Sequence, residues 1–121
     1  MAAQRGIVLL AHGSRDPLWR KPVEAVAERI RALDATALVR CGYLELTEPD
    51  LAGAVAQLTG QGARSIRVLP LFLGMGKHAR EDLPSLLEEL RAAHPQVAFE
   101  LATTVGEDSR LVDLLARIAL T

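Results

Sequence analysis

The segment that decides the fold reads Ile66-Arg67-Val68-Leu69-Pro70-Leu71-Phe72-Leu73 and continues as Gly74-Met75-Gly76-Lys77-His78. Its first part is a nearly continuous apolar run, which is typical of a strand covered on both faces. Its second part is a glycine-rich loop that ends in a cation and an imidazole. The segment therefore predicts a buried strand over residues 66–73 with polar groups at its carboxyl end.

An earlier segment repeats this design. The apolar run Gly6-Ile7-Val8-Leu9-Leu10-Ala11 has no polar alternation, and His12-Gly13-Ser14-Arg15 follows it. Such runs favour a parallel sheet, because its strands are buried on both sides. Two strands that each end in a histidine beside glycine and a basic residue predict one site at one edge of the sheet.

Further strands and helices alternate along the rest of the chain. Strands are expected at 37–43 and 97–102, and helices begin at Asp16 or Pro17, after Asp50, near residues 80–84 and after residue 106. We expect the second helix to close at Gly60 or Gly62 and the third to end before Pro95. The apolar positions predicted to face inward are Trp19, Val23, Val26, Ile30, Leu33, Leu51, Val55, Leu58, Leu83, Leu86, Leu87, Leu90, Leu111, Leu114, Leu115 and Ile118.

This alternation predicts an α/β fold: a single open, parallel four-stranded sheet with helices on both faces, in one domain spanning residues 1–121. In a flavodoxin-like strand order, 2-1-3-4, the strands at 6–11 and 66–73 are neighbours about 4.8 Å apart. His12 and His78 would then face one another at the point where the strand order reverses, which is where open α/β sheets bind ligands.

Composition excludes several classes of protein. With 121 residues, 50% of them hydrophobic, the chain is long and apolar enough for one folded domain. A net charge of −1 and 3% aromatic residues give no basis for nucleic-acid binding. No apolar run approaches the roughly 20 residues of a membrane helix, and Met1–Arg5 lacks the pattern of a signal peptide, so we expect a cytoplasmic protein. Cys41, the single cysteine, excludes an internal disulfide and is expected to be a small buried strand residue.

Polar residues follow each expected strand at the same edge. They are His12 and Arg15, Glu45 and Glu48, Lys77 and His78, and Thr103 and Thr104. Two neutral imidazoles with carboxylates nearby suit a divalent transition metal such as cobalt, nickel, iron or zinc. Two protein ligands leave coordination positions open, which is typical of a metal being handled rather than of a structural site. Imidazole also accepts a proton near neutral pH, so the same residues suit general-base chemistry.

A cluster of cations surrounds the two histidine loops. It comprises Arg15, Arg20, Lys21, Lys77 and Arg80. In a slightly acidic chain this local basic rim favours a substrate rich in carboxylates.

Structural roles compete with these functional ones. Gly74 and Gly76 are either turn glycines with positive φ or positions where the backbone approaches a ligand closely. Glu48 also suits the start of a helix, and Thr103 and Thr104 suit turns. His94, before Pro95, is expected to be an exposed cap residue.

Three motifs together resemble a known family. They are His12-Gly13-Ser14-Arg15, the run from Gly42 to Pro49, and the run from Val68 to His78 with Asp82-Leu83-Pro84 after it. In this order they resemble the short-form sirohydrochlorin chelatases, the CbiX and SirB type of class II tetrapyrrole chelatase. The resemblance covers nearly the whole chain.

The resemblance implies insertion of Co²⁺, Ni²⁺ or Fe²⁺ into sirohydrochlorin, with no organic cofactor, on a pathway to cobalamin, siroheme or a nickel tetrapyrrole. It makes His12 the proton acceptor and a metal ligand, and His78 the second ligand. Glu48 and the run Leu73, Gly74, Met75, Gly76, Lys77 and His78 would contact the macrocycle, and Glu45 would assist with metal or protons. Larger relatives have two such lobes, so the resemblance also implies a homodimer with macrocycles between protomers.

Two alternatives remain open. One is a carrier of tetrapyrrole or metal on the same fold, which binds without accelerating metal insertion. The other is a phosphotransfer enzyme with His12 as nucleophile, although no second arginine and histidine pattern completes a phosphate pocket.

Overall fold

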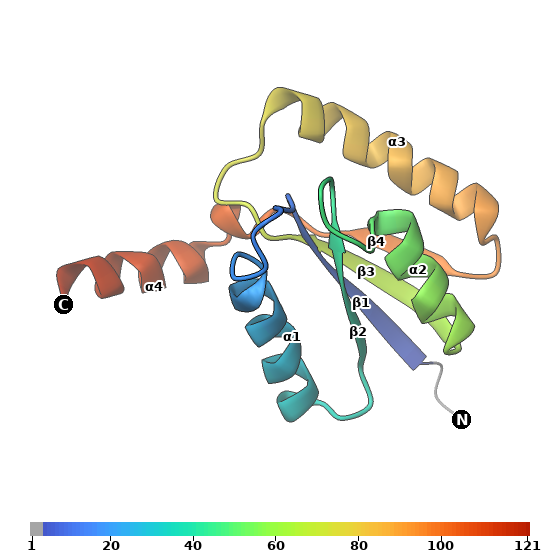
Figure 1. Ribbon diagram of the computed structural model, residues 1–121, viewed down its shortest axis with the longest axis horizontal. Helices are drawn as coiled ribbons and strands as arrows, with labels where there is room; N and C mark the ends of the chain where they lie inside the picture. The colour runs from blue at the N-terminus through green and yellow to red at the C-terminus, as the bar shows by residue number, and fades with distance from the viewer. Residues whose placement is uncertain (1–3) are drawn as a thin grey trace.

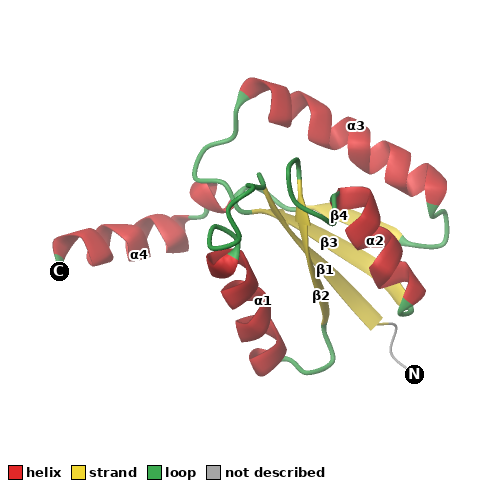
Figure 2. Ribbon diagram, viewed as in Figure 1, coloured by secondary structure: helices red, strands yellow, loops and turns green. Residues whose placement is uncertain are grey.

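The computed structural model describes residues 4–121 and shows a four-stranded sheet flanked by helices (Figures 1 and 2). The strands are β1 (Gln4–Ala11), β2 (Leu38–Tyr43), β3 (Ala63–Pro70) and β4 (Ala98–Leu101). The helices are α1 (Lys21–Leu33), α2 (Leu51–Gly60), α3 (Lys77–Ala93) and α4 (Ser109–Leu120), and a 3₁₀ turn, η1 (Val105–Glu107), precedes α4.

Residues 1–3, part of the segment in which we looked for a signal peptide, lie outside the described residues. Within residues 4–121, no helix combines the length and the apolar character needed to cross a membrane.

All four strands are parallel, in the order β2-β1-β3-β4, so the predicted fold class and strand order are confirmed. β1 lies between β2 and β3, and the register pairs Leu10 with Gly42 on one side and with Pro70 on the other. The carboxyl ends of β1 and β3 therefore meet side by side where the strand order reverses. In open α/β sheets this is the position of the ligand crevice.

Helices cover the two faces of the sheet unequally. On one face α2 packs against β2, β1 and β3, and α3 packs next to β4. On the other face α1 packs against β1 and β2 through Val23 and Ala27. The expected core residues Leu51, Val55, Leu58, Leu83, Leu87 and Leu90 are buried, whereas Val26, Leu33 and Leu86 are exposed, which corrects the prediction for those three.

Helix α1 begins at Lys21, later than predicted. Asp16 caps a separate turn, in which its side chain accepts a hydrogen bond from the Leu18 N–H (2.9 Å). A helix running on from Pro17 would need the N–H of residue 22 to reach the Leu18 carbonyl, but Pro22 has no N–H. The hydrogen-bonded ladder therefore starts after this turn, and Trp19 is exposed.

The junction between β3 and α3 also differs from the prediction. β3 ends at Pro70, which has no N–H to donate, and Leu71–Leu73 form a loop in which the Leu71 N–H still donates to the Leu10 carbonyl (2.8 Å). α3 begins at Lys77, with Gly76 as an extended cap residue, and Pro84 lies in its interior. The expected start near residues 80–84 is wrong, because the helix begins at Lys77 and continues through Pro84. Lys77 and His78 consequently occupy the first turn of α3.

Helix α4 extends away from the sheet (Figure 1). Asp108 caps it by accepting a hydrogen bond from the Arg110 N–H (2.8 Å). The predicted apolar stripe on one face is present, but none of its residues is buried in the chain: Leu111 is half-buried, and Leu114, Leu115 and Ile118 are exposed. The expectation that these side chains face inward is therefore wrong for the isolated chain.

Candidate active site at the carboxyl edge of the sheet

The loop that carries His12 is fastened to the loop after β2. The Leu44 N–H donates to the Ala11 carbonyl (2.9 Å), and the Glu45 N–H donates to the His12 carbonyl (2.9 Å). The Thr47 hydroxyl accepts from the Ser14 N–H (2.9 Å) and donates to the Ser14 carbonyl (2.8 Å). Both loops are thus held as one unit at the end of the two adjacent strands.

Gly13 makes this close approach of the two loops achievable. Its φ of +104° lies in a region that residues with a side chain rarely adopt. A Cβ atom at this position would overlap the carbonyl oxygen of Glu45. The glycine next to His12 therefore has a structural role in holding the backbone of His12 beside residues 44–47.

The imidazole of His12 lies against a fixed aromatic ring. The ring centroids of His12 and Phe72 are 4.5 Å apart, tilted by 37°. Phe72 is buried, and its carbonyl accepts hydrogen bonds from the Thr104 hydroxyl (2.6 Å) and from the Gly106 N–H (2.9 Å). The exposed imidazole is therefore supported by a side chain anchored from the end of β4.

Thr104 is expected to contribute measurably to this anchoring. In Thr104→Val the carbonyl of Phe72 keeps its hydrogen bond from Gly106 but loses the one from the hydroxyl, so we expect the free energy of unfolding to fall by about 1 kcal/mol. Thr103→Val, which changes an exposed neighbour in the same way, should alter it by less than about 0.5 kcal/mol. Urea denaturation measures both values, and equal effects of the two substitutions would contradict the anchoring role of Thr104.

His78 is placed on a different element from His12. It lies in the first turn of α3, with an exposed side chain, and the loop Leu73–Gly76 connects this turn to Phe72. No described contact joins the two imidazoles directly. The sheet brings His12 beside Phe72, whereas the position of His78 depends on the loop 73–76.

The two glycines of that loop are not turn glycines with positive φ. Within residues 4–121 only Gly13 and Gly62 among the glycines have positive φ, so that interpretation of Gly74 and Gly76 is wrong. A Cβ atom at either position would meet no heavy atom within 4 Å. The folded chain therefore leaves open space beside the backbone at both glycines.

The carboxylates stand at the surface of the same edge. Glu45 and Glu48 are exposed, and Glu48 also lines a 240 Å³ cavity between α1 and the edge strand β2. Among the described residues 4–121, no three His, Cys, Asp or Glu side chains gather closely enough to hold a metal ion. Within that part of the chain, the two histidines therefore belong to no complete ligand set.

The predicted basic rim is exposed throughout. Its members are Arg15, Arg20, Lys21, Lys77 and Arg80. These side chains are free to meet an anionic ligand at the carboxyl edge.

Cys41 and His94 have structural surroundings. Cys41 is half-buried in β2, and burial raises the pKa of its thiol, which disfavours the thiolate form that binds metals. Burial, together with the neighbouring Cys41, likewise raises the pKa of Tyr43 to about 12. His94 is the cap residue predicted, but it is half-buried, with its ring centroid 6.3 Å from that of Phe99.

Sequence reasoning missed two supporting residues of this edge. Thr47 holds the His12 loop, and Phe72 supports the imidazole. Phe72 lies in the expected strand 66–73, and Thr47 lies in a quoted motif, but nothing local predicts the bond of Thr47 to Ser14, which is 33 residues away in the sequence. Thr104 has the turn role that the sequence favoured, since its carbonyl accepts a hydrogen bond from the Glu107 N–H (3.0 Å) at the start of η1.

Comparison with known proteins assigns the chain to a family. The CbiX family matches residues 6–119. A sirohydrochlorin cobaltochelatase of Methanosarcina acetivorans is 34% identical over 95% of this chain and 94% of its own length. Another, from Sulfolobus acidocaldarius, is 33% identical over 91% of this chain and 85% of its own length.

Solved structures share the fold. A CbiX protein from Marinobacter aquaeolei VT8 aligns with a TM-score of 0.81 and 37% identity, over 95% of this chain and 93% of that one. The sirohydrochlorin chelatase SirB from Bacillus subtilis subspecies spizizenii, solved with cobalt, aligns with a TM-score of 0.79 and 25% identity over 94% of this chain but only 49% of SirB. The family and these relatives match nearly the whole chain. The chain therefore belongs to the CbiX family of sirohydrochlorin chelatases, as its three motifs predicted.

Proposed function

We propose that this protein inserts a divalent metal ion, Co²⁺, Ni²⁺ or Fe²⁺, into sirohydrochlorin. The observation that carries the proposal is the exposed imidazole of His12, supported by the buried ring of Phe72 at the carboxyl ends of the central strands. The names of the relatives support the substrate, and SirB structures with cobalt and with Fe³⁺ support a metal ion of this class.

The chemistry requires a base and weak metal ligands on one side of the macrocycle. Two pyrrole N–H protons must leave as four ring nitrogens replace the ligands of the metal ion, which is a substrate of the reaction. We assign His12 as the proton acceptor and a metal ligand, since imidazole performs both roles near neutral pH. His78, exposed on the first turn of α3, is the second ligand.

The macrocycle is held by the loops around these histidines. The open space above Gly74 and Gly76 lets a flat ring approach the backbone of residues 73–78, with Leu73 exposed beside it and Met75 partly in the core. Glu48 contacts the macrocycle, and Glu45 assists with metal or protons. The exposed cations of the basic rim pair with the carboxylates of sirohydrochlorin.

The active form in this proposal is a homodimer. The chain covers about half of SirB, so it supplies one lobe where SirB has twice the length. We treat residues 1–121 as one chelatase-like domain of a cytoplasmic protein, with macrocycles bound between two protomers. A symmetric pair would place a second set of ligands near each site, whereas residues 4–121 of one chain hold no complete set.

The test is the rate of metal insertion, followed as the absorbance change of sirohydrochlorin with Co²⁺, Ni²⁺ or Fe²⁺ in turn. We expect a rate above the protein-free control for at least one of these ions, and a comparison of the ions ranks them. Mixing the protein with the macrocycle alone gives its affinity. A rate equal to the control for every ion, despite tight binding of sirohydrochlorin, would contradict a chelatase and indicate a carrier.

A further inference from the structure

Leu46 has a backbone conformation that its side chain disfavours. Its φ is +61°, and it is the only residue other than glycine with a positive φ within residues 4–121. In this left-handed region the Cβ atom comes too close to the following carbonyl oxygen, so glycine and asparagine adopt it far more readily than leucine. Folding alone would therefore favour a different residue at this position.

Hydrogen bonds on both sides of Leu46 impose this conformation. Before it, the Glu45 N–H donates to the His12 carbonyl (2.9 Å). After it, the Thr47 hydroxyl accepts from the Ser14 N–H (2.9 Å) and donates to the Ser14 carbonyl (2.8 Å). The loop after β1 thus holds the chain on either side of Leu46, and strained backbone persists where the surrounding contacts over-determine it.

The side chain of Leu46 contributes little to the core. It is 57% exposed. In the part of the chain that the structure describes, neither hydrophobic cluster includes Leu46, whereas the nearby Leu44 packs against one of them. Strained residues gather at ligand-binding and catalytic sites, where the strain serves the site and not the fold. The exposed leucine is therefore a candidate for contact with a ligand.

Two other loops at this edge of the sheet also expose a leucine. Leu18, in the loop after β1, is 64% exposed, and Leu73, in the loop after β3, is 69% exposed. Each of the adjacent strands β2, β1 and β3 is thus followed by a loop with an exposed leucine. Large apolar side chains exposed together are typical of a surface that binds another molecule.

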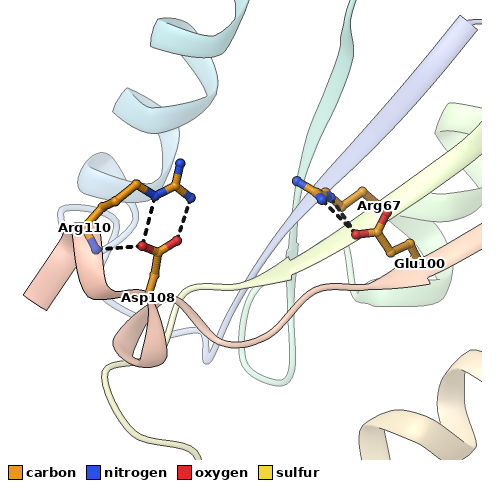
Figure 3. A network of polar contacts seen from close by, with 4 residues as sticks. All are labelled: Arg67, Glu100, Asp108 and Arg110. Carbon is orange, nitrogen blue, oxygen red and sulfur yellow. Dashed lines mark hydrogen bonds and ion pairs between the residues drawn. The ribbon is translucent and has the colours of Figure 1, made fainter.

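The cations at this edge are available to a charged ligand. Elsewhere in the molecule arginines pair with carboxylates of their own chain, as Figure 3 shows for Arg67 with Glu100 (2.8 Å) and for Arg110 with Asp108 (2.6 Å). Among the described residues, no ion pair includes a member of the basic rim. An apolar ring with carboxylates at its periphery would therefore find partners for both of its parts here.

We propose that Leu46 packs against the face of the macrocycle and that its strained backbone conformation is retained for this contact. The inference rests on the proposed function and adds a residue that positions the ring beside His12. Covering the exposed part of a leucine side chain contributes about a tenfold gain in affinity. Leu46 thus lowers the stability of the fold and raises the affinity for sirohydrochlorin, and the two effects can be measured separately.

Leu46→Asn separates the two effects, because asparagine tolerates the left-handed conformation but has no apolar side chain. We expect the midpoint of urea unfolding to rise by roughly 0.3 M or more. We expect the dissociation constant for sirohydrochlorin, measured by absorbance titration, to rise about tenfold. Leu46→Met keeps an apolar side chain, so its dissociation constant should stay within about twofold of wild type.

Leu33→Asn is the matched control. It replaces an exposed leucine at the end of α1, at the opposite edge of the sheet, and should leave the affinity for sirohydrochlorin unchanged. Equal losses of affinity in Leu33→Asn and Leu46→Asn would overturn the inference. Sedimentation velocity of the wild type and Leu46→Asn should give the same molar mass. A lower mass in the variant would show that Leu46 packs on another protein chain and not on the macrocycle.

The outcomes distinguish this inference from the proposed function. If Leu46→Asn binds sirohydrochlorin as tightly as the wild type, or unfolds at a lower urea concentration, the inference is wrong and the proposed function stands. A wild-type protein that does not bind sirohydrochlorin overturns both. Weaker binding together with higher stability in Leu46→Asn supports the inference, since a purely structural residue would not change the two quantities in opposite directions.

Discussion

Replacing His12 with alanine is expected to lower the protein-dependent rate of metal insertion by at least about 100-fold, the usual contribution of a general base. The variant removes a proton acceptor and a metal ligand but leaves the ring of Phe72 buried in place. Because His12 is exposed, little packing is lost, and the affinity for sirohydrochlorin should change much less than the rate. Single-turnover absorbance traces at saturating macrocycle separate the two quantities.

The third histidine provides a matched control. His94 ends α3, at the opposite end of the helix from His78, and packs near Phe99. His94→Ala should leave the insertion rate within about twofold of wild type, whereas His78→Ala should lower it and weaken the dependence on metal concentration. An insertion rate that is unchanged in His12→Ala would refute the assignment of the base, and equal losses in all three variants would point to a general effect on the fold.

Gly13→Ala is expected to be the most damaging single substitution for stability at the site, with a loss of about 3 kcal/mol or more in the free energy of unfolding. Strained backbone at positive φ costs roughly 1–3 kcal/mol. The new methyl group would also overlap the carbonyl of Glu45, so the hydrogen bonds between the His12 loop and residues 44–47 must break or stretch. Urea denaturation, monitored by circular dichroism, measures the change.

Gly74→Ala is the corresponding control, since its Cβ atom meets open space and its φ is not positive. Its free energy of unfolding should stay within about 0.5 kcal/mol of wild type. The same variant should bind sirohydrochlorin more weakly if the macrocycle lies over this loop. A Gly13→Ala protein as stable as Gly74→Ala would show that the two loops can separate without cost.

The order of strands and helices followed from the sequence because each signal was local. Apolar runs without alternation marked β1 and β3 as buried parallel strands, and the cap at Asp50 was correct, with its side chain accepting from the Gly53 N–H (2.8 Å). The predicted starts of α1 and α3 were wrong, because proline is found both in the first turn of a helix and in other positions. Because Pro22 has no N–H, α1 begins at Lys21 and not after Pro17. α3 begins at Lys77, and Pro84 lies in its interior.

The sequence predicted which residue types form the candidate site and at which edge of the sheet they lie. It did not predict the contacts that hold these residues in place. Parallel strands place all carboxyl ends together, so His12, Glu45 and Glu48 came to one edge for topological reasons. The contacts of Thr104 with Phe72 and of Thr47 with Ser14 span more than 30 residues of sequence and carry no periodic signal. The exposure of α4 had the same origin, because an amphipathic pattern shows that a face is apolar and does not say which chain covers it.

The fastening of the His12 loop by main-chain groups has a consequence for evolution and engineering. The hydrogen bonds of Leu44 and Glu45 to this loop use backbone atoms, so they persist when the side chains change. Exposed positions such as Glu45 and Leu73 can therefore be varied in a library with little loss of folding. Variants with altered preference for metal ions or macrocycles can therefore be selected at this edge of the sheet while the fold is retained.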